Sequence, residues 1–190
     1  MSATTRPADK PLADHLDLDR ASRWPLAIAR VIIGFLWFQQ LLWKLPPDFG
    51  CGPRGPASIG QPGATGLCDW ISREIAMPAV PLFATFLQSI VVPNFALFAW
   101  MTWLLEAFIA VSLLLGVLTR LGGLAGVAQS ANLLIGLVGV EHEWYWTYVM
   151  LLLFCAVLAL TGAGRVLGID RLLAKRISNG TAPSWLRFAV

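Results

Sequence analysis

Charged residues are scarce in this chain. Only 13% of its 190 residues carry a charge, against about 25% in soluble globular proteins. The net charge of +3 is small, and no stripe alternates basic and aromatic residues, which argues against binding to RNA or DNA. Hydrophobic residues make up 57%, and the mean hydropathy is +0.67. This composition predicts an integral membrane protein, with the lipid bilayer as a partner.

Motifs for bound cofactors and metals are also missing. The sequence has no Cys-x-x-Cys-His haem site, no dinucleotide fingerprint and no phosphate-binding loop. Its two histidines, His15 and His142, fall on opposite predicted sides of the membrane, and the acids beside His142 lack the i, i+4 spacing of metal ligands. We therefore predict no metal site and no covalently bound cofactor. Any electron carrier other than a diffusible quinone has to come from a partner.

Long apolar runs are what the chain has in abundance. About 20 apolar residues cross a hydrocarbon core of roughly 30 Å as a helix. Predicted spans cover residues 24–45, 94–119, 122–140 and 144–164, with an outer loop at 46–93. The predicted fold is all-α, an integral membrane four-helix bundle over residues 24–168 with short extracytoplasmic interfacial helices. Residues 1–23 are a predicted mobile tail, and residues 169–190 are a second tail whose apolar spacing suits a short surface helix.

Basic residues are sorted unevenly between the two predicted faces. Lys44, Arg54 and Arg73 lie on the loop side, whereas most other Lys and Arg residues lie on the side of the termini. The positive-inside bias predicts a multi-pass protein of the cell (inner) membrane with both termini in the cytoplasm. Residues 1–23 are polar and lack an apolar core before a cleavage site, so the first span itself is predicted to direct insertion.

The outer loop changes character at Cys68. Its first part is rich in Gly and Pro and predicts turns. The second part is apolar, but Pro78 and Pro81 leave a continuous run that is too short to span. We therefore predict one or two helices that lie on the membrane face or dip into it.

Cys51 and Cys68 bracket the first part of the loop, on the predicted outer side where disulfides persist. A structural disulfide closing a loop of about 17 residues would stabilise the fold by roughly 3 kcal/mol. A redox-active dithiol and free or partner-bound thiols are the alternatives, although the close Cys-x-x-Cys spacing of redox pairs is absent. Cys155 lies in an apolar helix and is predicted to be inert packing.

Glu106 is a carboxylate in the middle of the second predicted span. An ionised carboxylate at mid-bilayer costs at least about 2.5 kcal/mol, so it needs a partner, a proton or a place between helices. Helical rise puts Gln129 and Asn132 of the third span at nearby depths, and the long side chain of Arg30 can reach toward them. These four residues are the predicted quinone-binding or proton-relay candidates.

Three interpretations of this cluster stay open. Arg30 and Glu106 could form a structural ion pair, with the amides satisfying the remaining hydrogen bonds. The cluster could instead serve a quinone head group or relay protons, because a quinol needs donors to its oxygens and a carboxylate that accepts its proton. In the third interpretation Arg30 extends to the nearer membrane surface without contacting Glu106.

Segments from each predicted span resemble one known family. They are ARVIIGFLWFQQLLWKL in the first span, VVPNFALFAWMTWLLEAFIAVSLLLGVLTRLGGLAG across the second and third, and EWYWTYVMLLLFCAVLALTGAGRVLGID in the fourth. The chain resembles the DoxD and DoxX group of small four-span membrane proteins, and its closing GAGRVLGID is more similar to DoxD. DoxD is the small subunit of thiosulfate:quinone oxidoreductase. The resemblance implies a membrane subunit that passes electrons from thiosulfate or another sulfur compound to quinone, with other membrane-protein subunits as partners.

A second function fits the same features. Four small helices, polar tails and an outer cap also suit a non-catalytic accessory subunit of a larger respiratory or photosynthetic membrane complex. A small-molecule or lipid carrier has less support, because four spans without an inverted repeat or broken helices make a poor alternating-access device. Whether the chain takes part in catalysis stays open between the first two functions.

Overall fold

The computed structural model describes residues 12–181, 183, 186 and 188–190, with side chains from Trp24 onward. In this part of the chain the regular structure is helical throughout, as the sequence predicts. The elements are α1 (Leu12–Leu42), η1 (Gly55–Ser58), α2 (Gly66–Ala76), α3 (Pro81–Phe86), η2 (Leu87–Val91), α4 (Phe95–Leu115), α5 (Thr119–Leu137), α6 (Tyr145–Thr161), η3 (Ala163–Arg165) and α7 (Asp170–Ser178).

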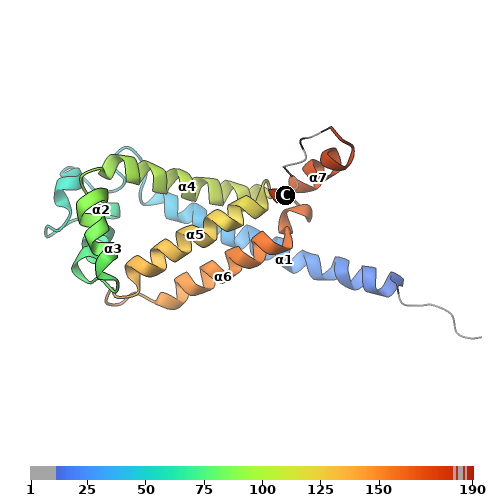
Figure 1. Ribbon diagram of the computed structural model, residues 1–190, viewed down its shortest axis with the longest axis horizontal. Helices are drawn as coiled ribbons and strands as arrows, with labels where there is room; N and C mark the ends of the chain where they lie inside the picture. The colour runs from blue at the N-terminus through green and yellow to red at the C-terminus, as the bar shows by residue number, and fades with distance from the viewer. Residues whose placement is uncertain (1–11, 182, 184–185, 187) are drawn as a thin grey trace, which may run out of the picture.

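Four long helices, α1, α4, α5 and α6, lie side by side (Figure 1). α1 packs on α4, α4 on α5 and α5 on α6, whereas α6 contacts α1 only sparsely. Residues 43–93, which include α2 and α3, cover one end of these helices, and we call this segment the cap. α7 and the C-terminus lie at the opposite end, from which α1 also enters.

The long helices follow the predicted spans to within a few residues, except at the start of the first. α1 begins at Leu12, well before Trp24, and continues through Pro25. Each added residue contributes one more backbone hydrogen bond to an existing helix, and residues 12–23 contain no glycine or proline to end it. The predicted tail is therefore helical from Leu12, while residues 1–11 lie outside the described part.

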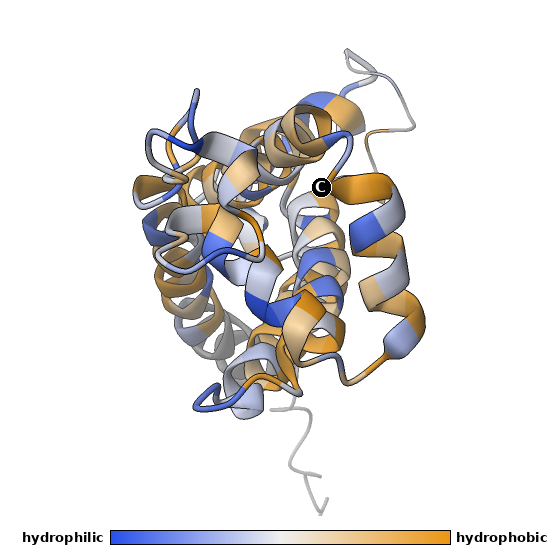
Figure 2. Cartoon of the chain, turned by 90° about the vertical axis from the view of Figure 1, so that its left-hand side faces the viewer, coloured by the Kyte–Doolittle hydropathy of each residue, from blue (hydrophilic) through white to orange (hydrophobic). Residues whose placement is uncertain are grey.

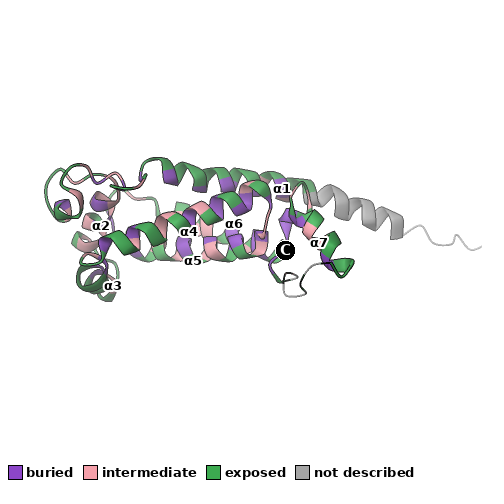
Figure 3. Ribbon diagram, turned by 90° about the horizontal axis from the view of Figure 1, so that it is seen from above, coloured by how far each residue is buried: buried purple, intermediate pink, exposed green. Residues whose placement is uncertain are grey.

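Two of the described helices are long and apolar enough to cross a membrane, namely Trp24–Leu42 within α1 and the whole of α4. α6 is apolar but has 17 residues, and α5 contains four glycines and polar amides that lower its mean hydropathy. Seen from the cap end, apolar residues occur along all the long helices (Figure 2). Buried residues recur along their inward sides and exposed ones along their outward sides (Figure 3). An outward surface of this kind suits contact with lipid.

Small residues on α5 set how closely its neighbours approach. A methyl group built on Gly123 would lie 2.8 Å from the backbone nitrogen of Ala159 in α6. One built on Gly126 would lie 2.6 Å from the sulfur of Cys155. Larger residues at these two positions would force α5 and α6 apart. Cys155 is accordingly buried and free, as the sequence predicts.

α1 runs antiparallel to α4 and ends about half-way along it. Gly34 packs directly against Leu113, where a larger residue would clash with the α4 backbone. Because both helices rise equally per residue, this contact places Leu41 level with Glu106. α1 ends one residue later, at Leu42, so the half of α4 nearer the cap has no α1 beside it.

The cap fills the space beside α4 beyond the last residue of α1. Phe49 is buried and makes edge-on aromatic contacts with Phe95 and Trp100 of α4. Cys51 and Cys68 are joined by a disulfide, which confirms the structural bond predicted from their positions. The cap also contains two short helices separated by prolines, in agreement with the sequence. The bonded loop is thus anchored on α4 and brings Lys44 to the interior.

Candidate functional site

A buried ion pair joins the segment after α1 to the middle of α4. Nζ of Lys44 lies 2.7 Å from Oε1 and 2.6 Å from Oε2 of Glu106. The ammonium donates a hydrogen bond to Oε1, whereas its contact with Oε2 lacks hydrogen-bond geometry. Lys44 is 4% exposed and Glu106 is fully buried. Each charge alone would be costly here, and the contact compensates part of that cost.

α5 supplies a third member of this group. Nε2 of Gln129 donates a 3.1 Å hydrogen bond to Oε1 of Glu106. The contact follows from helix register, because Gly126 packs against Ile109 and one further turn brings Gln129 level with Glu106. We call Lys44, Glu106 and Gln129 the central triad.

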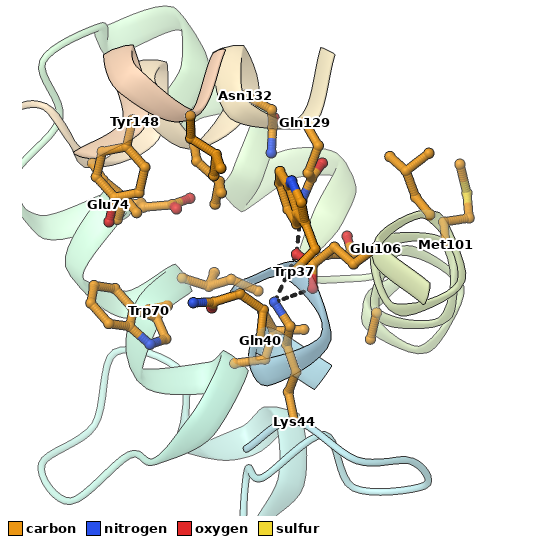
Figure 4. A pocket seen from close by; sticks show the side chains of 18 of the residues that line it. Trp37, Gln40, Lys44, Trp70, Glu74, Met101, Glu106, Gln129, Asn132 and Tyr148 are labelled. Atoms are coloured by element: carbon orange, nitrogen blue, oxygen red, sulfur yellow. Dashed lines mark hydrogen bonds and ion pairs between the residues drawn. The ribbon is translucent and has the colours of Figure 1, made fainter. Parts of the chain in front are cut away.

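A cavity of about 1140 Å³ opens beside the central triad. It lies among α1, α4, α5 and α6, and residues of the cap form part of its wall. Its lining is mainly apolar and aromatic, with polar side chains from Gln39, Gln40, Lys44, Glu74, Thr102, Glu106, Gln129, Asn132, Glu143, Thr147 and Tyr148. Glu106 and Lys44 lie on one side of it and Glu74 and Tyr148 on the other (Figure 4). Sites for small organic ligands combine apolar walls with a few polar groups in this way.

Arg30 is not part of this group, so the Arg30–Glu106 ion pair considered from the sequence is not formed. Nη2 of Arg30 donates a 3.0 Å hydrogen bond to the carbonyl oxygen of Leu167, and Nη1 lies against Gly116 at the end of α4. This position is about 21 Å along α1 from Lys44, at the end away from the cap. Of the four candidates, the structure brings Glu106 and Gln129 into contact and places Asn132 in the same cavity. It leaves Arg30 outside.

A second buried acid, Asp170, lies near Arg30. Oδ1 of Asp170 accepts a 2.7 Å hydrogen bond from the amide of Leu118, and Oδ2 accepts a 2.9 Å hydrogen bond from the amide of Thr119. The carboxylate therefore caps the start of α5, where unpaired amides and the helix dipole favour an anion. A side chain on Gly116 would overlap the Arg30 guanidinium. This cluster holds α1, α4 and α5 together at the end opposite the cap.

Glu74 is an acid of the cap that lines the cavity. It belongs to α2, and its carboxylate packs against Gly136 of α5, where an added methyl group would lie 2.7 Å from Cδ. Burial raises the pKa of Glu74 from 4.5 to about 7. Beside it in the cavity wall, the hydroxyl of Tyr148 donates a 2.8 Å hydrogen bond to Glu143. The cavity thus contains an acid that exchanges its proton near neutral pH.

Sequence reasoning missed Lys44 and Glu74 as site residues. Lys44 follows Trp37 by seven positions, a spacing that puts both on one face of a helix. Glu74 follows the buried residues Cys68 and Ile71 at intervals of three, which predicts a common face on α2. Both spacings are sequence signals that place these two charged residues on the buried face of their segments.

A family model described as the small subunit of TQO, DoxD, matches residues 62–187, well over half of the chain. The chain belongs to the DoxD family. No curated protein and no solved structure matches it. The resemblance found in the sequence is therefore confirmed at the level of the family.

DoxD membership and two helices long enough to span indicate a membrane protein that acts as a subunit of a larger system. TQO stands for thiosulfate:quinone oxidoreductase. The matched region contains Glu74, Glu106, Gln129 and Asp170, and it begins after α1. The two buried cations beside the acids, Lys44 and Arg30, come from the part of the chain before the match.

Proposed function

We propose that this DoxD protein is the membrane subunit of a thiosulfate:quinone oxidoreductase-like system and that its cavity binds quinone beside the central triad. The observation that carries the proposal is a hydrogen-bonded cation–carboxylate pair in the wall of a large, mainly apolar cavity. A quinone needs apolar surroundings for its ring and tail, donors for its carbonyl oxygens and a group that exchanges protons. All three are present in one place.

The reaction divides between this chain and a partner. Two thiosulfate ions form a sulfur–sulfur bond, giving tetrathionate and two electrons, and quinone takes up these electrons with two protons to give quinol. We assign the sulfur chemistry to a partner subunit, because the sequence holds no motif for a resident redox cofactor. In this chain Lys44 would donate a hydrogen bond to a quinone oxygen, and Glu106 would take up a proton from the cavity and pass it on to the reduced quinone.

The proposal also places all four long helices across the membrane, with the cap outside and both termini in the cytoplasm. The 17 residues of α6 extend about 25 Å, close to the thickness of the hydrocarbon core. Gln129 of α5 faces the interior of the bundle, where Glu106 accepts its hydrogen bond. The distribution of basic residues supports the same orientation.

Photoaffinity labelling tests the quinone site. The full chain in lipid nanodiscs would be labelled with an azido derivative of a short-chain ubiquinone, with and without excess ubiquinone. We expect competed labelling on peptides that line the cavity. Leu133→Trp should reduce it at least tenfold by filling the cavity, whereas Leu124→Trp, on an exposed position of the same helix, should not.

Thermal unfolding of both variants controls for misfolding. Labelling that excess quinone fails to compete, or equal labelling of the two tryptophan variants, would overturn the proposed site. That result would favour the alternative, a non-catalytic accessory subunit of a larger membrane complex. In that case the central triad would serve only to hold α1, α4 and α5 together.

A further inference from the structure

Three acids line the cavity, and two of them have hydrogen-bond partners: Glu106 in the central triad, and Glu143, which accepts a hydrogen bond from Tyr148. Glu106 is compensated by Lys44 and Gln129. Glu74 enters from the cap, on an element that comes from outside the four-helix core (Figures 1 and 4). An ionised carboxylate in the wall of a largely apolar cavity is energetically costly unless it has a partner of opposite charge or takes up a proton.

The space for the Glu74 carboxylate is made by the absence of a side chain on α5. An added methyl group at Gly136 would lie 2.7 Å from Cδ, 2.8 Å from Oε1 and 3.0 Å from Oε2. All three carboxyl atoms of Glu74 thus rest on one backbone position, which fixes the group at the boundary between α2 and the cavity. Glu74 is half-buried, so part of this residue stays accessible at the boundary between α2 and the cavity.

From these contacts we infer that Glu74 is the port through which protons pass between the cap side and the cavity. The inference rests on the proposed quinone function and deepens it. Reduction of one quinone by two electrons consumes two protons, and Glu74 would deliver them from the outer aqueous phase toward the central triad. Oxidation of quinol would send the same protons outward by the reverse route.

The charged and titratable neighbours agree with this role. Tyr148 and Glu143 of the α6 side form their own hydrogen bond beside Glu74, and Lys44 and Glu106 lie across the cavity. On its own helix Asp69 and Arg73 pair with each other at the surface. α3, η1 and η2 contain no charged residue, and α5 faces Glu74 with Gly136. No cation among these contributes to holding Glu74 ionised, and burial raises its pKa to about 7.

Infrared titration of the full chain in nanodiscs tests whether Glu74 exchanges protons. We expect a carboxyl group that titrates with a midpoint near pH 7 in the native chain. Glu74→Gln should abolish that titration, whereas Asp69→Asn, at the surface of the same helix, should retain it. A signal that persists in Glu74→Gln would overturn the inference. Because this measurement needs no quinone, it can fail while quinone labelling succeeds, and the reverse.

Proton uptake tests the route. Native protein and variants would be loaded with a short-chain ubiquinone in vesicles sorted by a tag after Val190 so that the side opposite the tag is the lumen. Dithionite would be added outside, and a pH dye enclosed in the lumen would follow proton uptake apart from the protons that dithionite oxidation releases outside. We expect protons to be taken from the lumen. Glu74→Gln should slow this uptake at least tenfold and Asp69→Asn, at the surface of the same helix, should not. Equal rates in the two variants, or no uptake from the lumen by the native protein, would refute the port.

Discussion

Lysine and glutamate in the central triad depend on each other at the scale of single residues. Lys44 and Glu106 are both shielded from water, so each needs the opposite charge. Arg73 and Asp69 form a comparable contact at the surface of α2, where water already stabilises both groups. The two pairs are therefore matched in chemistry and differ in burial.

Removing one partner of the buried pair should be much more costly than removing both. We expect Glu106→Gln alone or Lys44→Met alone to lower the free energy of unfolding by about 3 to 5 kcal/mol, because one buried charge is left uncompensated. The double variant should recover most of that loss. Arg73→Met should cost less than about 1 kcal/mol. Thermal unfolding in detergent checks this series, and strictly additive losses in the double variant would contradict it.

The sequence identified the acid and amide of the triad but could not select the cation. Arg30, Trp37 and Leu41 belong to the buried stripe of α1, and Lys44, two residues past the end of the helix, continues the same spacing. Helical spacing gives both cations the same face, and only the register between α1 and α4 decides which one meets Glu106. That register is set by the packing of Gly34 against α4, which is a tertiary contact with no signature in local sequence.

At the scale of elements, the start of α5 is built from a distant part of the chain. Thr119 and Leu118 have no side-chain cap of their own, and Asp170 at the start of α7 provides the acceptor. Local propensity predicts the helix itself, whereas this cap depends on how the chain returns after α6. The closing GAGRVLGID segment, noted for its similarity to DoxD, thus has a structural role in placing Asp170.

Loss of this cap should loosen α5 from its first turn. We expect Asp170→Ala to destabilise the protein by about 2 kcal/mol, since an N-terminal cap alone accounts for about 0.5 to 2 kcal/mol and Arg30 also loses a nearby negative charge. Asp170→Asn should retain part of the cap and lose less. Hydrogen exchange at Leu118 and Thr119 measures the local effect directly. Unchanged protection in Asp170→Ala would show that these amides have another acceptor.

At the scale of the whole molecule, the cap and the termini lie at opposite ends of the long helices. A reporter fused after Val190 should be active only in the cytoplasm, and one inserted at the exposed Gly60 of the cap should be active only outside. Lys and Arg in the short connections favour this orientation. Activity of the Val190 fusion on the outer side would contradict this orientation and place the cap in the cytoplasm.

Composition and apolar length predicted the four long helices, and the prolines at 78 and 81 predicted the broken helices of the cap. The sequence could not show that α1 stops half-way along α4 and that the cap descends beside it. This arrangement depends on aromatic contacts between Phe49 and α4, which join segments far apart in the chain. Glu74 was missed for the same reason, since its place in the cavity depends on Gly136.

The two buried cations in and just after α1 have a consequence for biogenesis. Lys44 and Arg30 leave the ribosome long before Glu106 and Asp170, so α1 must enter the bilayer with both cations uncompensated. Arg30 lies near the end of the bundle that faces the termini, and its long side chain can stay solvated at that interface until α7 arrives. Lys44 follows the end of α1 and lies in the folded chain level with Glu106, in the middle of α4. It can stay with the cap at the other interface until α4 packs on α1, so burial of the lysine and docking of α4 form one step.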